Sequence, residues 1–98
     1  MREVQIEIRL KEKVERIGGL SLKFISPGTA GVPDRLVLLP GKEIYFVELK
    51  APGKQLRPLQ LKRKKQLEDL GFKVYVIDSI RAVDSFMREV MPDEVHTV

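Results

Sequence analysis

Residues 31–50 have the sequence GVPDRLVLLPGKEIYFVELK, in which two apolar runs flank a Pro-Gly turn. The runs 35–39 and 44–50 consist largely of leucine, β-branched and aromatic residues, which is typical of strands. Residues 40–43, Pro-Gly-Lys-Glu, are typical of a hairpin turn. The stretch therefore predicts an antiparallel pair of strands.

Three charged residues stand at the ends of these strands. Asp34 directly precedes the first strand, and Glu48 and Lys50 end the second. Alternate residues of a strand share a face, so Glu48 and Lys50 point the same way, and the hairpin brings Asp34 beside them. The sequence therefore predicts two carboxylates and an ammonium group at one point.

Carboxylate oxygens are the ligands that Mg²⁺ prefers, with waters and a phosphate completing its six-fold coordination. Such an ion activates a water and neutralises charge that develops on the phosphate, and Lys50 can orient that water or offset that charge. The trio is thus suited to metal-dependent hydrolysis of a phosphodiester. The alternative is an exposed Glu48–Lys50 ion pair, worth at most about 1 kcal/mol.

The residues before the hairpin predict a helix and a strand. A helix is expected over residues 3–17, with apolar side chains every three or four positions: Ile6, Leu10, Val14 and Ile17. Gly18-Gly19 ends it. Residues 20–25 alternate apolar side chains (Leu20, Leu22, Phe24) with polar ones (Ser21, Lys23), which predicts a half-buried strand.

After the hairpin, the pattern predicts a loop over 51–56, a helix from Pro58 to about residue 70, a strand over 73–77 and a helix capped by Ser79 that extends to about Val90. Three leucines of the first of these helices are expected to face the core: Leu59, Leu67 and Leu70. The order α-β-β-β-α-β-α predicts an α/β fold, in which a mixed central sheet of about four strands is flanked by helices. A chain of 98 residues forms one domain, residues 1–98.

Composition excludes several kinds of site. The chain has no cysteine, and its one histidine, His96, lies two residues from the C-terminus. Disulfides, thiolate metal sites and cysteine nucleophiles are therefore excluded. Histidine-based zinc sites and serine triads lack the histidines that they need, apart from this one. No apolar run approaches the roughly 18 residues of a membrane span, and residues 1–5 alternate charged with small apolar side chains and lack the apolar region of a signal peptide. We expect a cytoplasmic protein.

Positive charge is concentrated in one part of the chain. The net charge is +4, yet residues 49–67 hold no acid and seven cations: Lys50, Lys54, Arg57, Lys62, Arg63, Lys64 and Lys65. Such a block favours a polyanion as partner. Five cations are candidates for contact with a DNA backbone: Lys54, Arg57, Lys64, Arg35 and Lys23. Gln60, one turn into the helix, can hold the attacking water or bridge Lys50 and a phosphate, although a glutamine on a helix is more often solvated.

Three segments resemble the successive motifs of the VRR-NUC domain family, a branch of the PD-(D/E)XK nuclease superfamily: GVPDR (31–35), FVELKAPGK (46–54) and PLQ (58–60). The resemblance extends from Glu3 to about Asp78. It implies a restriction-endonuclease-like core and DNA cleavage that depends on Mg²⁺, with Mn²⁺ as a substitute. It also implies a phage or bacterial protein similar to Holliday-junction resolvases, which are small homodimers that act on branched DNA such as four-way junctions.

The resemblance also implies roles for individual residues. Asp34, Glu48 and the backbone carbonyl of Leu49 are implied to bind the metal, Lys50 to act in catalysis, and Gln60 to take part in the site. The family further uses a glutamate on the first helix. Glu3 is the better match for that ligand, and Glu7, one turn later on the same face, is the alternative.

Two further expectations follow. The alternative to an active enzyme is an inactive DNA-binding or assembly module on a nuclease scaffold, but no core position of the motif is missing. A homodimer is expected because a symmetric junction suits a two-fold pair. The helix over 80–90 shows more apolar surface than a small core needs, so part of it is expected at the dimer interface, or else it covers one face of the sheet.

Overall fold

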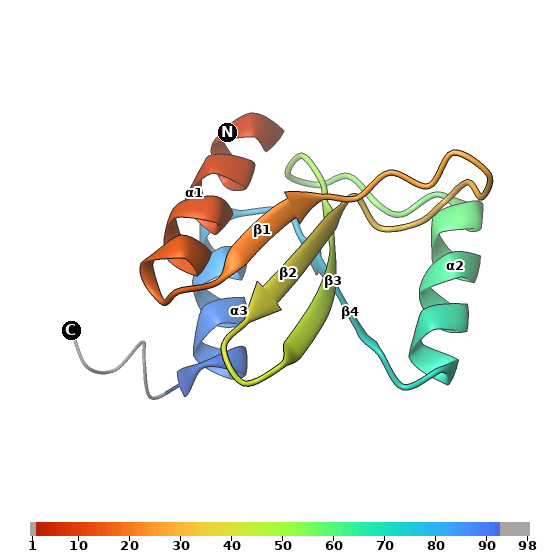
Figure 1. The fold of residues 1–98 in the computed structure, drawn as a ribbon. Helices are drawn as coiled ribbons and strands as arrows, with labels where there is room; N and C mark the ends of the chain where they lie inside the picture. The colour runs from red at the N-terminus through yellow and green to blue at the C-terminus, as the bar shows by residue number, and fades with distance from the viewer. Residues whose placement is uncertain (1, 93–98) are drawn as a thin grey trace.

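The computed structural model describes residues 2–92, so His96 lies outside the described part. The elements follow the predicted order (Figure 1): α1 (Glu3–Arg16), β1 (Leu20–Lys23), β2 (Arg35–Leu39), β3 (Glu43–Leu49), α2 (Pro58–Asp69), β4 (Lys73–Ile77) and α3 (Ile80–Val90). Each boundary lies within two residues of its prediction. No helix among residues 2–92 is long and apolar enough to cross a membrane.

The four strands form one mixed sheet in the order β1-β2-β3-β4. β1, β2 and β3 are antiparallel neighbours, and β4 pairs with β3 in parallel after the α2 crossover, as the sequence predicted. The register places Arg35 opposite Val47. Asp34, the residue before β2, therefore falls beside the last residues of β3.

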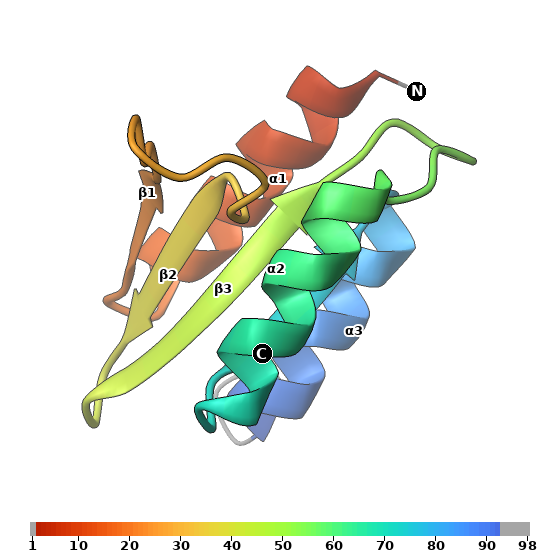
Figure 2. The same cartoon turned by 90° about the vertical axis from the view of Figure 1, so that its right-hand side faces the viewer.

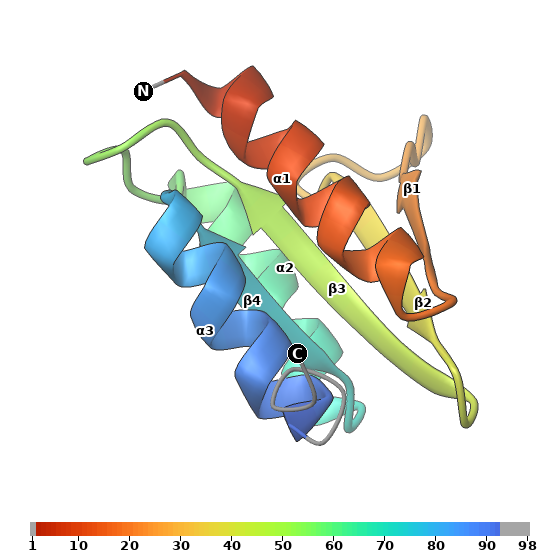
Figure 3. The ribbon, with the colours of Figure 1, turned by 90° about the vertical axis from the view of Figure 1, so that its left-hand side faces the viewer.

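α1 and α3 cover one face of the sheet (Figure 3) and bury the core against it. On β3, Tyr45, Val47 and Leu49 are buried, which confirms that alternate residues of this strand share the core side. The buried side chains are Ile6, Leu10, Val14, Val37, Leu39, Tyr45, Val47, Leu49, Val74, Ile77, Val83, Phe86 and Met87. The core thus lies between the sheet and the α1–α3 layer.

The apolar face of α3 packs against this core. Val83, Phe86 and Met87 are all buried, and Phe86 packs edge-on against Tyr45 and Tyr75. The second of the two expectations for this helix is therefore the correct one, because these side chains are needed to cover the sheet. They are not available for a dimer interface.

The opposite face of the sheet is covered only near β4, where α2 lies (Figure 2). No residue of α2 is buried, and Leu59 and Leu70 are 42% and 74% exposed. Leu20 and Leu22 on β1 are likewise 52% and 43% exposed. The prediction that Leu59 and Leu70 face the core is wrong, and the apolar side of the half-buried strand β1 is its exposed side, because alternation tells which side chains share a face but not whether a helix covers that face.

Candidate active site

A backbone hydrogen bond fixes the carboxylate of Asp34. Its Oδ1 accepts from the backbone N–H of Leu49 at 2.9 Å, which joins the start of β2 to the end of β3. The carbonyl of Asp34 accepts from the N–H of Phe24 at 2.8 Å and so ties the same residue to the end of β1. Asp34 is held from two neighbouring strands.

The loop before Asp34 packs directly on α2. Gly31 has φ +84°, and a Cβ built there would lie 2.8 Å from the carbonyl oxygen of Leu59. Nε of Arg63 donates to the carbonyl of Ala30 at 3.0 Å. Glycine is required at this position because the left-handed backbone and the close approach both exclude a side chain.

Glu48 is buried, with 7% of its surface exposed, on the face of the sheet that α2 approaches. Nζ of Lys50 lies 3.9 Å from its Oε2, and Nε2 of Gln60 donates to the same oxygen at 3.2 Å. Oε1 of Gln60 in turn accepts from the N–H of Arg57 at 2.8 Å, at the start of α2. With its two amide atoms, Gln60 therefore both orients Glu48 and caps the first turn of α2.

Both carboxyls are electrostatically unfavourable as anions. Burial, then the charge of Asp34, raises the pKa of Glu48 to about 7, against the opposing charge of Lys50. Burial also raises the pKa of Asp34, although the Leu49 N–H and the Arg35 guanidinium act in the opposite direction. The site thus holds more negative charge than Lys50 alone balances.

A divalent cation fits this arrangement. Asp34 and Glu48 offer hard oxygen ligands, and a cation between them would supply the positive charge that the burial of two carboxylates demands. The carbonyl of Leu49 belongs to the residue whose N–H already holds Asp34. The donor set is all oxygen and matches Mg²⁺ or Mn²⁺.

The two glutamates of the first helix lie differently. Oε1 of Glu7 pairs with Nη2 of Arg35 at 2.6 Å, whereas Glu3 is exposed and its charge contributes to the raised pKa of Glu48. Among residues 2–92, no three acidic or histidine side chains come together closely enough to hold a metal ion. The structure therefore does not bring either glutamate into a cluster with Asp34 and Glu48.

The five predicted DNA-contacting cations fall into three groups. Lys54 and Arg57 are exposed on the loop and first turn that lead into α2. Lys64 pairs with Glu68 at 2.9 Å, a contact that the i, i+4 spacing of the sequence already allowed. Lys23 and Arg35 line a hollow beside α1.

Sequence reasoning missed the part played by Arg63, which it treated only as one cation of a basic block. Its guanidinium holds the loop before Asp34 and also donates to Gln66 at 2.7 Å. Local spacing gives no signal for a contact that joins residues 33 positions apart.

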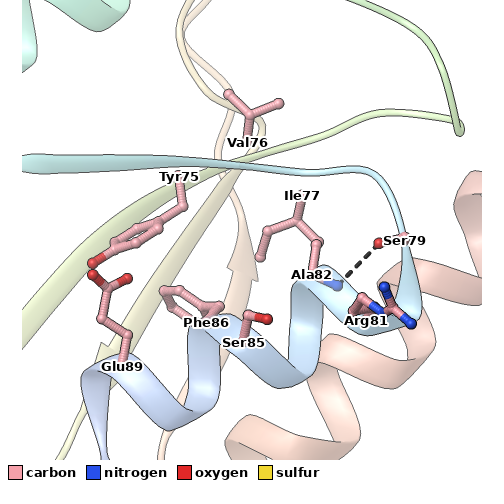
Figure 4. A pocket seen from close by; sticks show the side chains of 9 residues that line it. All are labelled: Tyr75, Val76, Ile77, Ser79, Arg81, Ala82, Ser85, Phe86 and Glu89. Atoms are coloured by element: carbon pink, nitrogen blue, oxygen red, sulfur yellow. Dashed lines mark hydrogen bonds between the residues drawn. The ribbon is translucent and has the colours of Figure 1, made fainter.

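A second hollow, of about 350 Å³, lies between β4 and α3, away from these carboxylates (Figure 4). Its polar groups already serve the fold. Ser79 Oγ accepts from the N–H of Ala82 at 3.0 Å, while burial and the hydrogen bond to Glu89 raise the pKa of Tyr75 to about 12. This hollow offers no set of groups for catalysis.

The known proteins to which the chain is similar include a phage protein and a solved structure. One is "Putative nuclease p44" of Acyrthosiphon pisum secondary endosymbiont phage 1, 52% identical over 79 residues, which are 81% of this chain and 85% of the phage protein. The other is a solved structure described as a VRR_NUC domain, with a TM-score of 0.84 and 34% identity over 90% of this chain and 96% of the other. No family model matches the chain.

Proposed function

Because the chain belongs to the VRR-NUC family, we propose that it is a nuclease, and more closely a divalent-metal-dependent DNA endonuclease whose reacting centre lies between Asp34 and Glu48. One observation carries the proposal. Two carboxylates from adjoining strands meet at the end of β3, both with raised pKa values, and an ammonium group lies 3.9 Å from one of them.

Asp34, Glu48 and the Leu49 carbonyl would hold Mg²⁺, with Mn²⁺ as a substitute. When bound, the ion supplies Lewis acidity toward a phosphate oxygen and a water. Lys50 places a positive charge beside this site, where it offsets charge on the phosphate or orients the attacking water. Gln60 acts as a positioning residue, since its amide holds Oε2 of Glu48.

Glu3 remains our preferred first-helix acid and Glu7 the alternative. The pairing of Glu7 with Arg35 supports this preference, because that carboxylate is already engaged. The charge of Glu3 acts on Glu48 directly. Glu3 would then bind through a water or after a small shift of the helix end.

Cations around the site would bind the DNA backbone. Lys54 and Arg57 are exposed beside it, and both are free of acidic partners within residues 2–92. Lys64, Arg35 and Lys23 would add contacts, although Lys64 must first exchange Glu68 for a phosphate. A nuclease from a phage or its bacterial host would act on DNA in the cytoplasm.

We further propose a homodimer that acts on branched DNA such as four-way junctions. The support is the uncovered face of the sheet, where six apolar side chains are 39–52% exposed: Leu20, Leu22, Ile44, Leu59, Phe72 and Val76. The register joins them, because Leu20, Leu38 and Ile44 form one row and Leu22, Leu36 and Phe46 the next. We call this surface the apolar face.

A second copy suits the apolar face better than nucleic acid does, because its two rows across β1, β2 and β3 hold no charged side chain. Rings of Phe24, Phe46 and Phe72 continue it, with centroids 5.9 and 5.5 Å apart. It lies on the same side of the sheet as Glu48. A two-fold pair formed there would relate two reacting centres by symmetry near the interface, as two symmetric cuts require.

Cleavage assays test this function. Four-way junction, nicked, flap and linear duplex DNA are incubated with Mg²⁺, Mn²⁺ or EDTA. We expect cutting with either metal and none with EDTA, loss of cutting in Asp34→Asn and Lys50→Ala, and a drop of about tenfold or more in Gln60→Ala, since a hydrogen bond to a charged group is lost. Gln55→Ala, on the exposed loop, is the matched control.

Two results would decide against the proposal. Cutting that survives both Asp34→Asn and Lys50→Ala would place the reaction elsewhere. Binding of DNA without cutting, by wild-type protein in either metal, would favour the inactive DNA-binding module instead.

A further inference from the structure

A polar hollow of about 330 Å³ lies between α1 and the β1–β2 edge of the sheet. Its lining consists of Glu7, Lys11, Ser21, Lys23 and Arg35. Three cations face one carboxylate, so the lining carries a net positive charge. The size lies at the lower end of the range for small-ligand sites, about 300–1,000 Å³.

The fold brings these five residues to one place from three elements. Lys23 pairs with Arg35 across β1 and β2, and Ser21 lies two residues before Lys23, so all three side chains share a face of the sheet. That face is the one that α1 covers. Glu7 and Lys11 are one helical turn apart on α1 and complete the lining from above.

Arg35 has hydrogen-bonding capacity to spare. Its side chain is 11% exposed, and Nη2 pairs with Glu7 at 2.6 Å, but its buried Nε has no partner within residues 2–92. A guanidinium offers five N–H donors in a planar fork that matches phosphate oxygens. A buried donor without an acceptor is unusual and indicates that the fork is only half used.

We propose that this hollow binds a phosphate group of the nucleic acid, next to the phosphate that is cut; the assignment rests on the proposed function. Arg35 follows Asp34 in the chain, and the charges of Arg35 and Glu7 both act on Asp34, so the hollow lies on the α1 side of the Asp34 carboxylate while Glu48 lies on the α2 side. Lys11 and Lys23 supply point charges, the Ser21 hydroxyl donates, and Arg35 contributes its fork. We name it the phosphate pocket.

Glu7 holds Arg35 in the free protein and competes with the phosphate for it. A phosphate that binds to the unused donors of the guanidinium lies beside the Glu7 carboxylate, which repels it. Removing the carboxylate charge should therefore tighten phosphate binding. This expectation separates the pocket from the alternative role of Glu7 as a metal ligand, which predicts lost cutting in Glu7→Gln and no change in phosphate affinity.

The experiment titrates inorganic phosphate into metal-free protein at constant ionic strength, and follows the backbone amide NMR signals of Ser21, Lys23 and Arg35. We expect saturable shifts, a loss of about tenfold in affinity in Lys11→Ala and in Lys23→Ala, and tighter binding in Glu7→Gln. Arg16→Ala is the matched control, because it removes an exposed cation of α1 outside the pocket. It should bind phosphate as the wild type does.

A second arm identifies the source of the phosphate. Short single-stranded oligonucleotides with a 5′-phosphate or a 5′-hydroxyl are compared on wild type and Lys23→Ala. A 5′-phosphate preference that Lys23→Ala abolishes assigns the pocket to a strand end. Equal binding of the two, weakened equally by Lys23→Ala, assigns it to an internal phosphodiester.

The pocket and the nuclease can fail separately. Protein that cuts DNA, but shows no saturable phosphate shifts and the same affinity in Lys11→Ala and Lys23→Ala as in Arg16→Ala, would overturn the pocket alone. Saturable phosphate binding with the expected losses, in a protein that cuts no DNA, would uphold the pocket as an anion site and overturn the nuclease.

Discussion

Glu48 is a carboxylate with 7% of its surface exposed, beside a second carboxylate, Asp34, that is also partly buried. Folding makes its ionised form less favourable, because water is removed and like charge is brought near. The folded protein therefore binds the Glu48 proton more tightly than the unfolded chain does. Stability from this residue is present at low pH and is lost as pH rises from about 4.5 through about 7.

Glu48→Gln should accordingly stabilise the metal-free protein at pH 8. The glutamine keeps an acceptor for Gln60 but carries no charge, so we expect about 1–2 kcal/mol of added stability at pH 8 and little change at pH 4.5. Thermal unfolding in EDTA at both pH values measures it. A Glu48→Gln protein that is less stable than wild type at pH 8 would contradict the claim that the ionised Glu48 carboxylate destabilises the fold.

Glu12→Gln serves as the control for this effect, because Glu12 is an exposed acid of α1. Its removal should change stability at pH 8 by less than about 0.5 kcal/mol.

The positions of single residues followed from the sequence where they depend on local geometry. Asp34, Glu48 and Lys50 were placed by the hairpin and by strand alternation alone. The contact of Gln60 with Glu48, by contrast, depends on how α2 is set against the sheet. The Glu7–Arg35 pair lies on the far side of Asp34, and no periodicity in the sequence links those two residues.

Among the elements, the segment between β1 and β2 sets the position of Asp34. The Phe24 N–H holds its start, and two adjacent contacts hold its end: Arg63 binds the carbonyl of Ala30, and Gly31 packs on α2. The accuracy with which Asp34 faces Glu48 thus depends on how this loop docks.

Gly31→Ala should destabilise the protein and slow cleavage. The new Cβ would approach the Leu59 carbonyl to 2.8 Å at a left-handed backbone angle, which together should cost about 1–3 kcal/mol. Chemical denaturation measures the change in unfolding free energy. Gly28→Ala is the matched control in the same loop, since nothing lies within 4 Å of a Cβ there and its φ is not positive.

Equal stability of Gly31→Ala and Gly28→Ala would show that the loop does not dock on α2 as described.

Element order and boundaries were predictable because helix and strand periods differ and glycine and proline mark the ends. Which helix covers which face of the sheet was not predictable. Leu20, Leu22 and Leu59 have the same spacing whether or not a partner lies over them. Only the fold shows that α1 and α3 take one face and leave α2 alone on the other.

For the molecule as a whole, the apolar face is the feature that least suits a monomer, because it exposes apolar side chains that a monomer would bury. A stable interface buries about 800 Å² per partner, while apolar patches of typical monomers reach about 300–600 Å². A sheet face that stays open over β1, β2 and part of β3 needs cover on this scale. Another copy of the chain supplies it with matching chemistry.

Light scattering should therefore give twice the chain mass at tens of micromolar protein. Leu22→Lys should give the mass of a single chain, because a charge within the apolar face must be desolvated on pairing. Val4→Lys is the control, since Val4 is 47% exposed on α1 and outside the face. A single-chain mass for wild type would refute the dimer, and a Leu22→Lys dimer would refute this interface.

Calorimetric titration of Mn²⁺ and Mg²⁺ into the protein is the most direct measurement of the claim that Asp34 and Glu48 hold one cation. We predict one saturable site in wild type, at least about tenfold weaker in Asp34→Asn and in Glu48→Gln, and unchanged in Asp69→Asn, whose carboxylate pairs with Lys65 on α2. Both site variants keep the side-chain oxygen that accepts a hydrogen bond, so the fold is preserved. Metal affinity in Asp34→Asn and Glu48→Gln equal to that of wild type would contradict the account.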